Sequence, residues 1–326
     1  MNSSKINNTA TVMCFGLKDL KGFYVSEYLI TTALLTILSS VAACIVAMVG
    51  NALTLYSIWK ASLLSNPSYM IIACLAITDF LSSITILPFN IVIRFQDMFN
   101  VHSCILKRIF STVATILIGW SMLTTCIINL DCFLSLYFPF RFKTWNLNTW
   151  YLVAIVSSWS LWLLYSLLGA SSILSLRTFI SIQVSTIIGC LAIILTCQIL
   201  IYRLIKARQT RIGVLAPNQS TATQVIDGVV QRNQRKSRMT IFIITAAFLI
   251  CFFPRCAVIV AFSAARSPSF TLVYQGSRFS ETILFANSAI NPIIYSFRLP
   301  KIGKRVLALL RRSFSWFARP SRSESS

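Results

Sequence analysis

The sequence predicts an all-α membrane protein, a bundle of seven transmembrane helices followed by a short amphipathic eighth helix. Three observations support this prediction. Hydrophobic residues make up 56% of the 326 residues and charged residues only 11%, which is too apolar for a soluble domain. Seven stretches are long enough to cross a bilayer, and Lys and Arg gather in the segments on one side of them.

The predicted spans follow from the thickness of hydrocarbon that a helix must cross. One crossing needs about 20 mostly apolar residues, because the backbone must satisfy its hydrogen bonds internally. The stretches that qualify are residues 28–59, 67–93, 105–137, 150–168, 179–206, 239–265 and 276–298. The fourth is the shortest and the seventh the least apolar, so six or eight spans are the alternatives.

The basic residues predict the orientation of the chain. With the N-terminus outside, most of the 29 Lys and Arg residues fall on the inner side, as the positive-inside rule requires. The net charge of +21 is then explained by topology and by attraction to anionic inner-leaflet lipids, so no nucleic-acid partner is needed. We expect an extracellular segment 1–27, a membrane domain 28–298 and a cytoplasmic tail 299–326 of a plasma-membrane protein.

The N-terminal segment and the cysteines fit this orientation. Residues 1–27 lack the apolar core of a cleavable signal peptide, so the first span is expected to act as its own signal. Asn2 and Asn7 begin glycosylation sequons that would face outward. Most of the ten cysteines fall inside spans as small packing residues, and a Cys14 to Cys104 bridge is one option on the oxidising side. No Cys or His spacing suggests a metal site.

Few polar side chains fall inside the spans, and these are candidates for function because polar groups are costly in a bilayer. They occur in short motifs, which read GNALTL from Gly50, LAITD up to Asp79, DCFLSLYFP from Asp131, VSSWSLW around Trp159, FLICFFP up to Pro254 and NPIIY from Asn291.

In this order and spacing, the motifs resemble those of the rhodopsin-like (class A) G-protein-coupled receptors, in every span except the fifth. The resemblance implies a cell-surface receptor with no enzymatic activity. It would bind an extracellular ligand and signal to a heterotrimeric G protein or arrestin through movement of the sixth helix. A channel or transporter is the alternative, although one deep carboxylate and no repeated halves argue against it.

The resemblance assigns a sodium site to four residues, Asp79, Ser121, Asn287 and Asn291. Carboxylate, hydroxyl and amide oxygens suit a hard cation, and Asn287 and Asn291 share one helix face. A polar network that only locks the helices together is the equal alternative. Apart from this ion, no cofactor is expected.

Other residues match the switch positions of the family. Pro254 and Pro292 would kink the sixth and seventh helices into hinges. Phe252 replaces the usual Trp two residues before Pro254, so the switch would be steric; its companion Phe248 lies one turn below. The two tyrosines expected to face the inner crevice are Tyr295 and Tyr202.

The foot of the third helix departs from the family. Where the family has an acid, Arg and Tyr, this chain has Asp131, Cys132 and Phe133. Asp131 is expected to pair with Arg141 or Lys143 in the second inner loop. Without the Arg we expect a weakly latched resting state with high or lost basal activity, so a receptor that has lost coupling is a further alternative.

The ligand is the least defined part. Ala114 stands where amine receptors have Asp, which disfavours a monoamine. The candidate lining of the outer cavity is Asn90, Thr115, Arg255, Cys256, Glu281 and Phe285. An Arg255 to Glu281 ion pair that staples two helices is favoured over a grip of Arg255 on an acidic ligand.

The loop after the fourth span, about 169–178, is short and contains no cysteine, and Ile194 replaces the proline of the fifth helix. This pattern is similar to the branch of melanocortin, lysophospholipid, cannabinoid and adenosine receptors. After Tyr295, apolar residues at helical spacing alternate with cations, which predicts an amphipathic helix on the inner leaflet.

Overall fold

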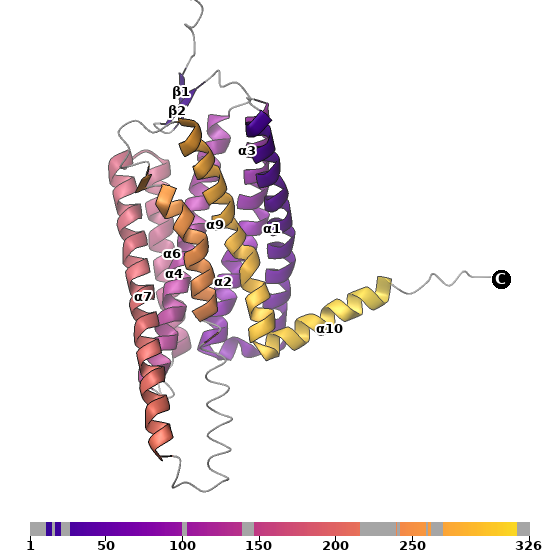
Figure 1. Cartoon of the computed structure of the whole chain (residues 1–326), viewed down its shortest axis with the longest axis vertical. Coiled ribbons are helices and arrows are strands. Elements are labelled where there is room, and N and C mark those ends of the chain that lie inside the picture. The colour runs from indigo at the N-terminus through magenta and orange to yellow at the C-terminus, as the bar shows by residue number, and fades with distance from the viewer. Residues whose placement is uncertain are drawn as a thin grey trace, which may run out of the picture.

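The computed structural model describes residues 11–14, 17–20, 27–99, 103–138, 147–215, 239, 242–258, 260–261 and 270–317. Its helices lie side by side in one elongated bundle (Figure 1). Two short strands lie at one end, and the last helix leaves from the other. We call the end with the strands the N-terminal end of the bundle and the opposite one the C-terminal end.

The helices of the bundle agree with the predicted spans. They are α1 (Glu27–Lys60), α2 (Pro67–Ile84) with α3 (Ile86–Met98), α4 (Cys104–Tyr137), α6 (Leu147–Ala170), α7 (Leu176–Leu215), a helix Phe242–Val258 that we call the sixth helix, and α9 (Phe270–Arg298). Within the described residues, five helices are long and apolar enough to cross a bilayer, with α2 and α3 counted as one. The sixth helix is apolar but shorter, and α9 carries more polar residues. The prediction of an all-α transmembrane bundle is confirmed.

The second span differs from its prediction as a single helix over 67–93. It is broken at Thr85, whose backbone angles of −120° and −72° lie outside the helical range. Pro88 supplies the reason, because it has no N–H to donate to the carbonyl of Ile84, one turn earlier. The Thr85 hydroxyl donates to the carbonyl of Leu81 at 2.6 Å, and the Thr85 N–H donates to the same carbonyl at 3.1 Å, so the hydrogen bonds of α2 continue up to the break.

Large apolar side chains cover the outside of the bundle. Leu38, Leu161 and Ile250 are each more than 60% exposed, which would be unusual on a soluble protein. Polar side chains such as Asn51, Asp79 and Asn129 are instead buried between helices. This distribution suits a bundle whose outer surface faces lipid.

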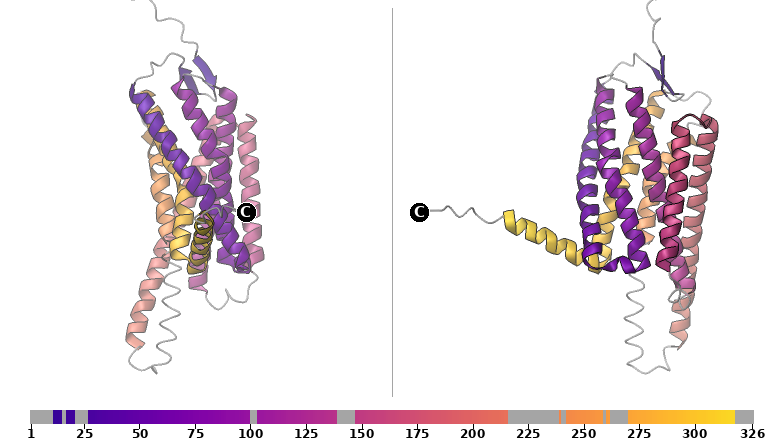
Figure 2. Two further views of the ribbon diagram at one scale, coloured as in Figure 1. Left: turned by 90° about the vertical axis from the view of Figure 1, so that its right-hand side faces the viewer. Right: turned by 180° about the vertical axis from the view of Figure 1, so that it is seen from behind.

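The last helix, α10 (Pro300–Phe317), points away from the bundle at its C-terminal end (Figure 2). Ile302 and Val306 are buried against the core, while Lys304 is exposed, as expected for an amphipathic helix. The turn into α10 requires Gly303, because a Cβ atom there would overlap the carbonyl oxygen of Ser296.

The two strands were not predicted from the sequence. β1 (Thr11–Cys14) and β2 (Leu17–Leu20) form an antiparallel hairpin in which Thr11 pairs with Leu20 and Cys14 with Leu17. The predicted glycosylation sites Asn2 and Asn7 lie outside the described residues.

Candidate functional site

The buried carboxylate Asp79 joins α2 to α9 near the middle of the bundle. Its Oδ1 atom accepts a hydrogen bond from the Ser288 hydroxyl at 2.9 Å, and its Oδ2 atom accepts one from the Asn291 amide at 2.7 Å. Asp79 is 1% exposed. A carboxylate buried to this extent needs such donors, since an unsatisfied charge in the interior is strongly unfavourable.

A small cavity lies beside this group, and Ser288 belongs to both. Ser121 and Asn287, two of the predicted sodium ligands, line it together with Ser82. Among the described residues, the side-chain oxygen of Asn287 is buried and accepts no hydrogen bond, and the same holds for Asn291. Acceptor oxygens without donors beside a carboxylate are the donor set that a hard cation prefers, so these residues fit a sodium ion.

Ser288 was not predicted at this site. It lies three residues before Asn291, which places both on one face of α9 and therefore toward Asp79. That spacing was visible in the sequence, but a serine alone does not stand out among apolar residues.

The helix-one motif Gly50–Asn51 packs against the proline of α9. A Cβ atom on Gly50 would lie 2.7 Å from Cγ of Pro292, so only glycine permits this approach of α1 to α9. Pro292 cannot donate to the carbonyl of Ser288, four residues earlier. The Asn51 amide donates to that carbonyl at 3.0 Å and thereby replaces the missing helical hydrogen bond.

The predicted aromatic switch lies in the centre of the bundle. The rings of Phe248 and Phe252 stack with their centroids 4.8 Å apart, below Pro254 of the same helix. Both are buried in a cluster of apolar side chains that α4, α7 and α9 contribute, namely Met122, Cys126, Cys190, Ile194 and Leu284. Ile194, at the place of the usual proline, is therefore a core residue of this cluster.

The two tyrosines expected at the inner crevice are in different environments. Tyr295 is fully buried in the apolar core near the C-terminal end, whereas Tyr202 of α7 is 65% exposed. The structure does not bring the two side chains together. Pro292, also predicted as a hinge, lies inside α9 three residues before Tyr295.

At the foot of α4, Asp131 is 1% exposed and accepts a hydrogen bond from the Ser68 hydroxyl at 2.7 Å. Ser68 belongs to the first turn of α2, where backbone N–H groups create a positive potential that favours an anion. The Tyr151 hydroxyl lies near the same carboxylate. The predicted partners, Arg141 and Lys143, lie outside the described residues.

Cys132 replaces the arginine of the family and makes an apolar contact. It is buried together with Leu136 and Ile201, and Phe133 packs on this group. The contact between α4 and α7 at this level is therefore hydrophobic.

At the N-terminal end of the bundle, two carboxylates each lie between two cations. Glu281 forms ion pairs with Arg255 at 3.3 Å and with Arg94 at 3.2 Å. Asp97 pairs with Arg278 at 2.9 Å and lies 4.0 Å from Lys107. The predicted Arg255 to Glu281 pair is present, and Arg94, which the sequence analysis did not select, completes it. We call these six residues the outer charge cluster.

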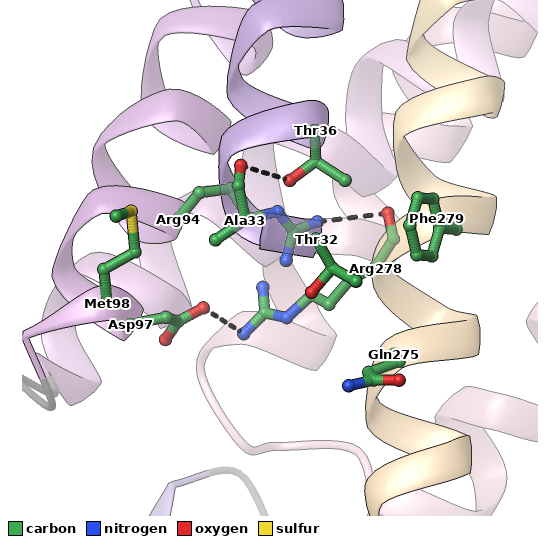
Figure 3. A pocket seen from close by; sticks show the side chains of 9 residues that line it. All are labelled: Thr32, Ala33, Thr36, Arg94, Asp97, Met98, Gln275, Arg278 and Phe279. Carbon is green, nitrogen blue, oxygen red and sulfur yellow. Dashed lines mark hydrogen bonds and ion pairs between the residues drawn. The ribbon is translucent and has the colours of Figure 1, made fainter. Parts of the chain in front are cut away.

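A second small cavity borders this cluster between α1, α3 and α9 (Figure 3). Arg94 and Arg278 reach into it from opposite sides, and Thr32 and Gln275 add polar groups. Arg94 is 2% exposed and also donates to the backbone carbonyl of Arg278 at 3.3 Å.

The other residues predicted to line the ligand cavity make different kinds of contact. Asn90 is fully buried and donates to the Ser40 hydroxyl of α1 at 3.0 Å, so it joins two helices. Thr115 donates to a carbonyl of its own helix. Phe285 packs edge-on against Phe110, with the ring centroids 5.8 Å apart. Cys256 is half-buried beside Arg255.

The short connection 171–175 between α6 and α7 is held by Arg108 of α4. The guanidinium donates to the carbonyl of Ala170 and to the Ser172 hydroxyl. Cys104, one turn earlier in α4, is disulfide-bonded. Its predicted partner, Cys14, has a side chain outside the described part of the chain, and the cysteines within the spans are free thiols, as expected.

Comparisons with known proteins agree with this architecture. Residues 169–295 match the model of a protein family described as 7 transmembrane receptor (rhodopsin family). Trace amine-associated receptor 7a of Rattus norvegicus is 24% identical over 292 residues, which cover 80% of this chain and 78% of the relative. Trace amine-associated receptor 8c of Mus musculus is 26% identical over 301 residues, with coverage of 82% and 83%.

These relatives differ from the branch that the short loop suggested, and they agree with the general resemblance. The motifs, the transmembrane bundle and the comparisons all indicate a G-protein-coupled cell-surface receptor rather than an enzyme. The chain is therefore similar to the rhodopsin-like family, the class A G-protein-coupled receptors.

Proposed function

We propose that this receptor responds to an acidic extracellular ligand bound at the outer charge cluster, and that it signals to a heterotrimeric G protein at the C-terminal end of the bundle. The observation that supports this ligand class is the charge of the cluster. Four cations, Arg94, Arg255, Arg278 and Lys107, surround two carboxylates. Such an excess of positive charge in a partly buried site favours a carboxylate or phosphate.

The same geometry disfavours an amine ligand. An ammonium group needs an available carboxylate, and both oxygens of Glu281 already bind guanidinium groups. Ala114, where the amine receptors carry Asp, is a buried apolar residue packed in the core. The names of the trace amine-associated receptors therefore do not transfer their ligand class to this chain.

Arg255 is the most accessible cation of the cluster, with 30% of its side chain exposed. It belongs to the sixth helix, one residue after Pro254, so a ligand bound to it would act directly at the hinge. A ligand anion that displaces Glu281 from Arg255 would release the sixth helix from α9. The competing interpretation is a permanent staple between these helices.

The test is a screen of carboxylate and phosphate compounds on surface-expressed receptor, read by direct G-protein and arrestin recruitment. Arg255→Ala should abolish the response to an acidic hit, and the double change Arg255→Ala with Glu281→Ala should not restore it. Rescue by the double change would support the staple alone. Arg177→Ala is the matched control, because it removes an exposed cation from the same end of the bundle.

We also propose that a sodium ion binds beside Asp79. Its ligands would be oxygen atoms of Asn287, Asn291 and Ser121, with the Ser288 hydroxyl as an additional oxygen ligand. The fit of the acceptor oxygens supports it. The polar network without an ion remains the competing role of the same residues.

We propose that the N-terminus is extracellular and the C-terminus cytoplasmic, with α10 on anionic inner-leaflet lipids. The distribution of Lys and Arg supports this orientation. The test attaches an epitope tag to each terminus of the receptor and detects the tags on intact and on permeabilised cells. Both tags on the same face of the membrane would contradict this orientation. A receptor without G-protein coupling is the second candidate, and the apolar surroundings of Cys132 favour it.

A further inference from the structure

Three polar side chains from three helices meet at one point below the aromatic switch. Asn129 of α4 accepts hydrogen bonds at Oδ1 from the Gln198 amide at 2.6 Å and from the Thr245 hydroxyl at 3.1 Å. The same Gln198 amide nitrogen also lies 3.1 Å from the Thr245 hydroxyl and donates to it. Each of the three side chains is therefore hydrogen-bonded to the other two. We call these residues the polar triangle.

The polar triangle is largely buried and firmly placed. Asn129 is fully buried and Thr245 is 1% exposed, while Gln198 is half-buried. The Asn129 amide also donates to the carbonyl of Thr125 at 2.7 Å, and this bond fixes which way the side chain points. In hydrocarbon surroundings water does not replace such partners, so breaking the triangle leaves polar groups unsatisfied.

The triangle is the polar attachment of the inner half of the sixth helix. Between described residues, the hydrogen bonds and ion pairs from this helix to other helices come from Thr245 and, at the opposite end, Arg255. The neighbouring contact between α4 and α7, one turn further along, is the apolar group around Cys132. Cys132 thus stands at this level of α4 in place of the arginine that forms the ion pair of the family.

Movement of the sixth helix would break the triangle. Thr245 lies nine residues before Pro254, about 13 Å along the helix from the hinge. A swing of about 15° at the proline, directed away from α4, would displace Thr245 by about 3.5 Å and so break its 3.1 Å hydrogen bond to Asn129. The triangle is thus formed in the closed arrangement of the sixth helix and lost in an open one.

We propose that the polar triangle Asn129–Gln198–Thr245 is the resting latch of this receptor, in place of an ion pair at the foot of α4. This inference rests on the proposed function in one respect, namely that opening of the sixth helix activates a G protein. A hydrogen bond between membrane helices shifts an equilibrium by about threefold on average. Loss of both bonds of Thr245 should therefore raise the open population by about five- to tenfold.

The experiment measures the opening itself and the signal separately. Spin labels on unnatural amino acids at Tyr137 of α4 and Phe242 of the sixth helix report their separation; both side chains are more than half exposed. Thr245→Val keeps the shape and removes the hydroxyl. Thr54→Val is the matched control, since Thr54 is equally buried and, among the described residues, its hydroxyl bonds only to the carbonyl of Gly50 in its own helix.

For Thr245→Val without ligand, we expect more of the long-distance population and higher basal G-protein activation per surface receptor. Gln198→Leu should act in the same direction, and the double variant should exceed the larger single effect only slightly. Unchanged distances with a lower melting temperature would show a static clamp and overturn the proposal, as would an equal shift in Thr54→Val. Changed distances without G-protein activation in any variant would support the latch and contradict the proposed coupling.

Discussion

Replacing Asn51 by Leu tests how the kinked seventh helix is stabilised. Asn51 is fully buried, and its amide satisfies the Ser288 carbonyl that Pro292 leaves without a helical partner. Leu has a similar volume, so the change removes the donor with little cavity. A buried carbonyl left unpaired costs about 1–3 kcal/mol, and the melting temperature should fall by roughly 2–10 °C.

Thermal denaturation of purified receptor in detergent, followed with a thiol-reactive dye, measures this change. The decisive comparison repeats the substitution in a Pro292→Ala background. Ala at position 292 has an N–H that donates to the Ser288 carbonyl, so the Asn51 donor becomes redundant. The cost of Asn51→Leu should then drop below about 0.5 kcal/mol. An equal cost in both backgrounds would refute the assignment of Asn51 to this carbonyl.

Three further predictions concern neighbouring contacts. Gly50→Ala places a methyl group 2.7 Å from the Pro292 ring, so α1 must move and we expect a loss of about 1–3 kcal/mol, measured by the same melting assay; an unchanged melting temperature would contradict the close approach. Ser68→Ala removes the donor to buried Asp131 and should cost about 1.5–3 kcal/mol, whereas full surface expression and stability would show that this bond is unimportant. Sodium chloride should stabilise the receptor relative to choline chloride, by about 1.4 kcal/mol at ten times the dissociation constant, and Asp79→Asn should remove this difference; a salt effect that survives in the variant would exclude the site.

The sequence predicted the helices and their motifs because their signals are local. Long apolar stretches mark the spans, and Pro254, Pro292 and Asp79 stand out against them. Pro88 also carried a local signal for the break between α2 and α3, but a proline near the end of a span is ambiguous between a kink and a boundary.

The interhelical contacts could not be predicted from the same information. The polar triangle requires Asn129, Gln198 and Thr245 to face one another, which depends on how each helix is rotated in the bundle. Helices that contact lipid on one side and protein on the other are apolar on both, so periodicity does not identify the buried face. The same reason hid the role of Arg94 beside Glu281.

The attachment of the short connection 171–175 by Arg108 affects how the entrance of the receptor responds to its surroundings. Residues 171–175 contain no cysteine, so no disulfide bond ties this connection directly, and Arg108 holds it through reversible hydrogen bonds. Reducing agents would leave it in place, whereas concentrated salt or a competing anion near the guanidinium would loosen it. Reductant sensitivity of ligand entry, if observed, would therefore have to arise at Cys104 instead.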